Sequence, residues 1–242
     1  MPDLVPDSTI LLIALIGCFG LFVQSASGFG SGLIAMPLLI QLLGVTEAQA
    51  TFAICAPVTG VFLMWRYRRH LSIKRVWRII LAAIIAIPFG VQIPNLVPKE
   101  IALFVLGLVC LGYAIYSLLG LYVPKLNRNW GFFFGALGGL LHGAYNTGGP
   151  PYIIYGTGQR WPPFEFKGNI QTIFFVTGFF VIATHWQAGN ITADVLRNAA
   201  ILLPGMFVGM WLGGIVDRYI KPEPFRKVVL VLLIFLGLSL IF

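Results

Sequence analysis

Hydrophobic positions along this chain are gathered in long runs that no charged residue interrupts. The runs without Asp, Glu, Lys or Arg are residues 8–46, 48–65, 79–98, 101–124, 129–159, 168–193, 198–216 and 228–242. About 20 apolar residues suffice to span a bilayer as a helix, so most of these runs are long enough to be transmembrane helices. The pattern predicts an all-α integral membrane protein.

The composition agrees with this prediction. Hydrophobic residues make up 58% of the chain and charged residues only 10%, where soluble domains carry about 25%. Cys18, Cys55 and Cys110 lie inside apolar runs without metal-ligand or CxxC spacing. We therefore expect buried free thiols, with no disulfide, metal or other cofactor. The N-terminus has no basic residue before the first apolar run, so we expect that run to be retained and not cleaved as a signal peptide.

The basic residues predict the orientation of the chain. If the acidic N-terminus lies outside, all but two of the 16 basic residues fall inside. The inside set is Arg66, Arg68, Arg69, Lys74, Arg75, Arg78, Lys125, Arg128, Arg160, Lys167, Arg218, Lys221, Arg226 and Lys227, and the outside pair is Lys99 and Arg197. Short cytoplasmic loops retain Lys and Arg, which explains the net charge of +8 without a nucleic-acid partner. Both termini are predicted to be periplasmic or extracellular, in a bacterial-type inner membrane.

The chain also contains a weak internal repeat, which divides it into a first half, 1–124, and a second half, 125–242. The matched positions are Phe19, Gly20 and Gly28 with Phe134, Gly135 and Gly143, then Gly90 with Gly209 and Gly112 with Gly237. The run 129–159 is too short for two full spans, which need about 40 residues, so a re-entrant or short helical hairpin is favoured there and by analogy in 8–46. A hairpin followed by three spans in each half gives two inverted repeats. Chance matching among 28 glycines is the alternative.

The two hairpins carry the candidate chemistry. Residues 24–32 and 139–151 place helix-breaking residues in the middle of apolar segments, where broken backbone needs protein or a wet cavity to satisfy it. A helix that restarts there directs free N–H groups and its positive dipole end at the cavity, which favours an anion. The candidate substrate-binding residues are Gln24, Ser25, Ser27, Gly28, Gly30, Ser31, Gly32, His142, Gly143, Asn146, Thr147, Gly148 and Gly149.

Several of these residues have a structural alternative. Gly139 and Gly143 form a GxxxG pair, which usually lets two helices approach closely. His142 could donate to an oxyanion or take part in proton coupling, and a neutral packing histidine is equally consistent with its position. Gln24 could face the cavity or bond a neighbouring helix. Arg160 and Lys167 could attract anions to an inward-facing mouth, although ordinary orientation charges are the favoured interpretation.

The hairpins resemble the signature motifs of the sulfite exporter TauE/SafE family, a resemblance that covers essentially the whole chain. The first family motif, G-x-G-G-G followed by P-x-L, is matched by Gly28, Gly30, Gly32, Pro37 and Leu39, with Ser31 in place of a glycine. The second, roughly G-x-x-x-G-x-x-G-x-G-G-P, is matched by Gly139, Gly143, Gly148, Gly149 and Pro150, with Asn146 as a departure. The resemblance implies transport of sulfite, sulfonates or related sulfur anions across the inner membrane.

An exporter of small sulfur-containing anions such as sulfite, sulfonate or thiosulfate is therefore the favoured function. No Asp or Glu lies deep in an apolar run, where a carboxylate would repel an anion. For a cell with a negative interior, each anionic charge that leaves gains about 2.3 kcal/mol per 100 mV, so export could run as uniport. A membrane scaffold without transport is one alternative, and a membrane enzyme is less favoured because the histidines are scattered and the acids lie in loops. The expected partners are a small anion and the lipid bilayer, and a homodimer is compatible with the sequence.

Overall fold

The computed structural model describes residues 7–217, 219 and 222–242, so Arg218, Ile220, Lys221 and the first six residues lie outside the described part. Within this part the chain is all-helical. The helices are α1 (Asp7–Ser27), α2 (Ser31–Leu43), α3 (Val45–Tyr67), α4 (Ile73–Leu96), α5 (Lys99–Leu118), α6 (Trp130–Tyr145), α7 (Gly149–Gly158), α8 (Pro163–Gln187), α9 (Ala193–Val216) and α10 (Pro222–Ile241), with a 3-10 turn, η1, at Arg68–His70. The predicted all-α class is confirmed.

Seven of the described helices are long and apolar enough to cross a membrane: α1, α3, α4, α5, α8, α9 and α10. The other three are shorter, with 13 residues in α2, 16 in α6 and 10 in α7. The two hairpins therefore differ. The first joins the span-length α1 to the short α2, whereas both arms of the second, α6 and α7, are short. The difference follows from the greater length of the apolar run 8–46.

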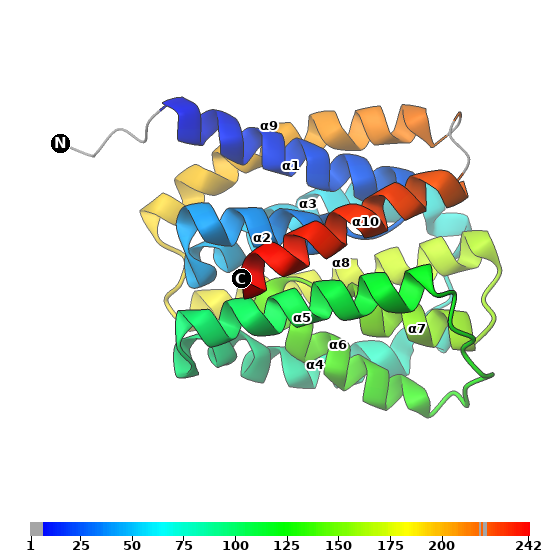
Figure 1. Ribbon diagram of the computed structural model, residues 1–242. Helices are drawn as coiled ribbons and strands as arrows, with labels where there is room; N and C mark the ends of the chain where they lie inside the picture. Colours follow the sequence, from blue (N-terminus) through cyan, green and yellow to red (C-terminus); the bar gives the residue numbers. More distant parts are fainter. Residues whose placement is uncertain (1–6, 218, 220–221) are drawn as a thin grey trace.

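Helices far apart in the sequence lie side by side (Figure 1). The most extensive pairs are α1 with α9 and α4 with α6, followed by α5 with α10 and α3 with α8. Each of these pairs joins a helix of residues 1–124 to a helix of residues 125–242. The two halves are thus packed into each other and do not form separate bundles.

Glycines explain how the two largest pairs pack so closely. Gly205, Gly209 and Gly213 recur every fourth residue along α9, and a Cβ on any of them would overlap a backbone carbonyl oxygen of α1. The same holds in α6 for Gly135, Gly139 and Gly143, which pack against backbone carbonyls of α4. Small residues at this spacing let two helix backbones approach inside a membrane, where the hydrophobic effect does not drive helix association.

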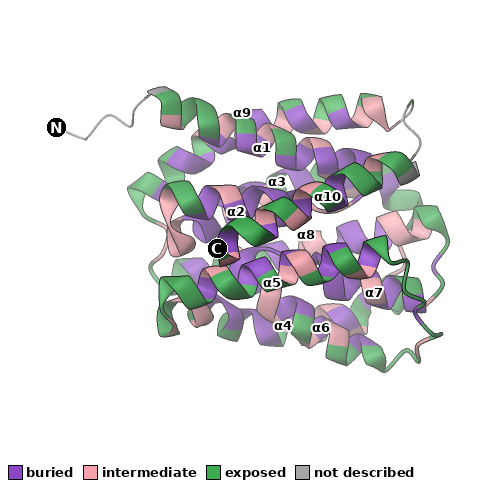
Figure 2. Cartoon of the chain, in the orientation of Figure 1, coloured by how far each residue is buried: buried purple, intermediate pink, exposed green. Residues whose placement is uncertain are grey.

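The outside of the bundle is apolar and its interior contains polar groups. Large hydrophobic side chains such as Phe62, Phe89 and Trp211 are exposed on the outer helix faces, and exposed residues cover the outer faces in Figure 2. Buried polar residues include Gln49, Thr147 and Asn169. A protein in water rarely exposes apolar surface on this scale, whereas lipid is the solvent that suits it.

The connections α3–α4, α5–α6 and α7–α8 lie at one end of the bundle, together with the C-terminal end of α9 (Figure 1). The N-terminal end of α1 lies at the opposite end, and α10 runs toward that end. The described basic residues of those connections are therefore gathered at one end, as the charge pattern requires for a single orientation.

Candidate functional site

The first hairpin breaks between α1 and α2 at two glycines. Gly28 has φ +92° and Gly30 has φ +105°, both in the left-handed region that side chains other than glycine rarely adopt. The second hairpin breaks after Tyr145, where Asn146 takes a left-handed conformation with φ 52°. Asparagine is one of the few residues other than glycine that tolerate this conformation. The chain therefore turns at both predicted stretches.

The two turns meet inside the bundle. A Cβ on Gly32, in the first turn of α2, would overlap the backbone carbonyl oxygen of Asn146, so only glycine fits there. The Asn146 side chain is fixed in turn, because its Nδ2 donates to the Gln49 carbonyl oxygen of α3 at 3.0 Å. Two segments that are distant in the sequence thus form the two sides of one site.

A small cavity of about 40 Å³ lies at this junction, more than the roughly 10–15 Å³ that one water needs. Eight of the predicted site residues line it: Gln24, Gly30, Ser31, Gly32, His142, Asn146, Thr147 and Gly149. Residues of α3 and α8 also line the cavity and were not predicted from the sequence; they include Phe52, Gln171 and Phe174. A glutamine inside the apolar run 168–193 was the available signal for Gln171.

The N-terminus of α2 supplies backbone donors to this junction. The Ile34 N–H donates to the Gly30 carbonyl oxygen at 3.2 Å, and no side chain caps the helix. The N–H groups of Ser31, Gly32 and Leu33 therefore have no acceptor within the helix. The N-terminus of α7 offers fewer donors, because prolines follow Gly149 in its first turn and proline has no N–H.

Two buried polar atoms beside the cavity have no partner. Thr147 is 1% exposed and its Oγ1 makes no hydrogen bond, and the same holds for Oδ1 of Asn146, which is 6% exposed. Leaving such an atom unpaired costs about 1–3 kcal/mol, so a bound polar solute would be stabilised here.

His142 lies on the α6 side of the same cavity and is 4% exposed. Its Nδ1 is 3.0 Å from Oγ1 of Thr177 on α8, and its ring meets the Phe174 ring edge-on at a centroid distance of 5.8 Å. The histidine is thus held by α8 on one side and faces the cavity on another.

The remaining predicted residues lie outside the cavity lining. Ser25 donates to the Met210 carbonyl oxygen of α9 at 2.9 Å, and Ser27 Oγ lies 2.7 Å from the Val23 carbonyl oxygen of its own helix. Gly143 packs on the α4 backbone, as the GxxxG alternative predicts, and Gly148 packs against the Gly138 carbonyl. Packing explains the latter two glycines without a ligand.

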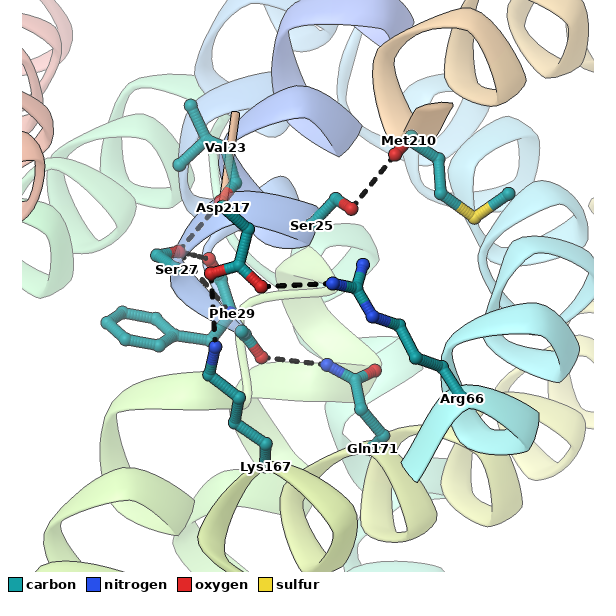
Figure 3. A network of polar contacts seen from close by, with 10 residues as sticks. Val23, Ser25, Ser27, Phe29, Arg66, Lys167, Gln171, Met210 and Asp217 are labelled. Carbon is teal, nitrogen blue, oxygen red and sulfur yellow. Dashed lines mark hydrogen bonds and ion pairs between the residues drawn. The ribbon is translucent and has the colours of Figure 1, made fainter. Parts of the chain in front are cut away.

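A series of hydrogen bonds through side-chain amides and one hydroxyl group connects the α1–α2 link, residues 28–30, to α8. Ser31 donates to Oε1 of Gln24, whose Nε2 lies 3.4 Å from Oε1 of Gln171. Gln171 Nε2 in turn donates to the Gly28 carbonyl oxygen at 2.7 Å, and Figure 3 shows this side chain reaching the link. Gln24 therefore both lines the cavity and bonds a neighbouring helix.

A larger cavity of about 540 Å³ is also lined by residues at this break. Ser27 and Phe29 line the larger cavity, together with Lys167 and Arg226. Lys167 lies 3.4 Å from Asp217, which also pairs with Arg66 at 3.0 Å (Figure 3). Arg160 is not in this lining, and its guanidinium instead donates to the Val123 carbonyl oxygen at 2.8 Å.

Span-length helices around a small buried polar cavity define a multi-pass α-helical membrane protein, and comparison with known proteins identifies its family. The model of the family "Sulfite exporter TauE/SafE" matches residues 13–240, so the chain belongs to this family. The family and its named relatives are transporters, in agreement with the expectation that the chain is not an enzyme.

Two curated relatives are similar to the chain. The "Probable sulfite/organosulfonate exporter TauE" of Cupriavidus necator is 29% identical over 241 residues, which cover 95% of this chain and 92% of that protein. The "Probable inner membrane transporter protein TsaS" of Comamonas testosteroni is 31% identical over 103 residues, covering 42% of this chain and 43% of that protein. No solved structure matches the chain.

Proposed function

We propose that this protein carries a small sulfur-containing oxyanion across a bacterial-type inner membrane and binds it in the 40 Å³ cavity between the two helix breaks. The observation that carries the proposal is the N-terminus of α2, where free N–H groups adjoin unpaired Thr147 Oγ1. None of the described residues that line the cavity is an acid, so no carboxylate opposes an anion. Backbone amides and the helix dipole then supply the attraction.

The packing of the helices supports two inverted repeats, residues 1–124 and 125–242. If α1–α5 correspond to α6–α10, the pair α1–α9 becomes α6–α4, which is the other large pair. Under the same correspondence α3–α8 and α5–α10 each map onto themselves. Such a pattern is expected for two related halves around a pseudo-twofold axis, with the site where the interrupted helices meet.

The favoured direction is export, and the larger cavity is the entry for the anion. This cavity contains Lys167 and Arg226 and lies toward the end of the bundle with the basic connections, which the charge pattern assigns to the cytoplasm. Basic groups at an entrance raise the local concentration of anions. The link at Gly28, held by Gln171, is the barrier between the entry and the site.

Thr147→Val tests the site, because it removes the hydroxyl group and keeps the shape of the side chain. A hydrogen bond to a charged group contributes about 1.5–3 kcal/mol, so we expect sulfite affinity to fall at least about tenfold. The measurement is sulfite flux into proteoliposomes together with a thermal-shift titration of the purified protein.

Thr184→Val is the matched control, since Thr184 bonds only the Phe180 carbonyl oxygen of its own helix at 2.8 Å. It should transport like the unmodified protein. Unchanged sulfite binding in Thr147→Val would contradict the proposed site. Absence of sulfite or sulfonate flux from the unmodified protein would contradict the proposed function and favour a scaffold.

A further inference from the structure

The hydrogen bonds of Thr177 determine where His142 carries its proton. Thr177 Oγ1 lies 2.7 Å from the Ile173 carbonyl oxygen, four residues earlier in α8. A carbonyl oxygen can only accept, so the single hydrogen of the hydroxyl group is directed to it. The contact of 3.0 Å with His142 must then be donated by the ring, which places the hydrogen on Nδ1.

A neutral imidazole has one N–H, so Nε2 of His142 is left as a hydrogen-bond acceptor. No acid is among the described residues that line the cavity, so no protein carboxylate is present to pair with a second proton on the ring. His142 therefore adds a lone pair to a site in which the N-terminus of α2 attracts negative charge.

Asn146 adds a second acceptor. Its Nδ2 donates to the Gln49 carbonyl oxygen at 3.0 Å, which fixes the orientation of the amide. Oδ1 is consequently the free atom of the side chain, and it is buried without a partner. The cavity thus combines donors from the N-terminus of α2 with acceptors from α6 and its C-terminal cap.

An anion without a hydrogen-bond donor satisfies only half of this site. Its oxygens suit the N–H groups of α2, but they would meet the lone pairs of His142 and Asn146 as well. An anion that also carries an O–H group satisfies both sets, because buried acceptors need a donor.

We infer that the cavity selects monoanions that carry an O–H group, of which hydrogensulfite is the simplest sulfur example. The anionic oxygens bind the N–H groups of α2, and the O–H donates to His142 Nε2 or Asn146 Oδ1. His142 is then the residue that determines specificity and Thr177 the residue that positions it. This inference rests on the proposed function and adds the protonation state of the solute.

The test compares hydrogensulfite with methanesulfinate, which has the same charge and pyramidal shape but a methyl group in place of the O–H. Each anion competes against labelled sulfite for flux into proteoliposomes that contain the unmodified protein. We expect methanesulfinate to inhibit about tenfold more weakly or worse, because it leaves an acceptor unpaired. Equal inhibition by the two anions would overturn the inference, since it would mean that binding gains nothing from the O–H group. Absence of sulfite flux would instead contradict the proposed function.

Thr177→Val examines the positioning role. Without the threonine oxygen, the ring hydrogen can move to Nε2, and we expect the preference for hydrogensulfite to fall toward equality. Thr172→Val is the control: Thr172 is a buried threonine of the same helix, bonds the Gly168 carbonyl oxygen at 2.8 Å in the same way and should keep the preference. A Thr177→Val protein with the full preference would overturn the role of Thr177. The comparison of anions on the unmodified protein does not depend on how this variant folds.

Discussion

Gln171 holds the α1–α2 link in place against α8. Its amide group is buried, with Nε2 donating to the Gly28 carbonyl oxygen at 2.7 Å and Oε1 3.4 Å from Nε2 of Gln24. Gly28 is in a left-handed conformation at the break between the helices, so its carbonyl oxygen accepts no hydrogen bond within a helix. The Gln171 side chain supplies the donor instead. One residue thus fixes the position of the break from which α2 begins.

Gln171→Leu should loosen this link. The change leaves the Gly28 carbonyl and one end of Gln24 unpaired, and we expect the free energy of unfolding to fall by about 1–3 kcal/mol. Sulfite affinity should also fall, because the N-terminus of α2 is no longer held at the cavity. Thermal unfolding in detergent and proteoliposome flux measure the two effects.

Gln92→Leu serves as the comparison, because Gln92 is exposed on α4 and bonds only the Pro88 carbonyl oxygen of its own helix at 3.2 Å. It should change neither quantity. Equal behaviour of the two variants would show that Gln171 does not hold the link.

Residues at the breaks could be predicted from sequence, whereas those that reach the cavity from other helices could not. Glycine, serine and asparagine in the middle of an apolar run indicate exposed backbone amides, and Ser31, Asn146 and Thr147 do adjoin the cavity. Phe52 and Gln171 reach it only through the packing of α3 and α8, which no local pattern encodes. Gly143 was predicted to bind the substrate, but it packs against α4 and does not line the cavity. The sequence alone does not distinguish a glycine that packs against a helix from one that exposes a backbone amide.

At the scale of elements, close helix pairs depend on glycines that face a neighbouring backbone. Gly209 of α9 lies against the Cys18 carbonyl of α1, and Gly139 of α6 lies against the Ala83 carbonyl of α4. Gly112 of α5 is different, since it is exposed and a Cβ there would meet nothing within 4 Å. A side chain in place of glycine would therefore disturb the contact of α9 with α1, but it would meet no neighbour on α5.

Gly209→Ala should separate α1 from α9, because a methyl group would overlap the Cys18 carbonyl oxygen. Overpacking of this kind costs about 1–3 kcal/mol, so we expect a thermal midpoint several degrees lower in detergent.

Gly112→Ala, by contrast, should leave the midpoint unchanged or raise it, since alanine favours a helix over glycine by about 0.5–1 kcal/mol where space allows. If both alanine variants behave alike, the close contact between α1 and α9 is not what stabilises the bundle.

The helices themselves were largely predictable, because a charged side chain is costly in lipid and its absence indicates a span. The runs 168–193 and 198–216 correspond to α8 and α9 in this way. The ends of the uncharged runs predict the ends of helices less well where a loop is itself apolar. The run 101–124, for example, extends beyond α5, which ends at Leu118. Charge could not show that 8–46 contains a span-length helix followed by a short one, since a break between helices changes no charge.

At the scale of the whole molecule, the two halves pack through each other. Helix α1 contacts α9 and α4 contacts α6, so the hairpin of each half is covered by a helix of the other. A glycine repeat predicts two related halves, but it does not predict which of their helices meet. This arrangement depends on three-dimensional packing, and it brings both breaks to a single cavity.

Orientation in the membrane is the property of the whole chain that the charge pattern predicts most directly. Labelling of an introduced cysteine with a membrane-impermeant maleimide can test it, because of the three native cysteines Cys55 and Cys110 are buried and Cys18 is only partly exposed. We select Arg69→Cys in η1, at the basic end of the bundle, and Ala188→Cys after α8, at the opposite end. The unmodified chain gives the background.

In cells with a permeabilised outer membrane and an intact inner membrane, the maleimide should label Ala188→Cys. Arg69→Cys should react only after the inner membrane is permeabilised as well. The reason is that retention of basic loops in the cytoplasm places η1 inside and therefore the α8–α9 connection outside. The reverse pattern would place the 540 Å³ cavity with Lys167 and Arg226 on the outer side. That cavity would then receive anions from outside, and uptake would replace export as the favoured direction.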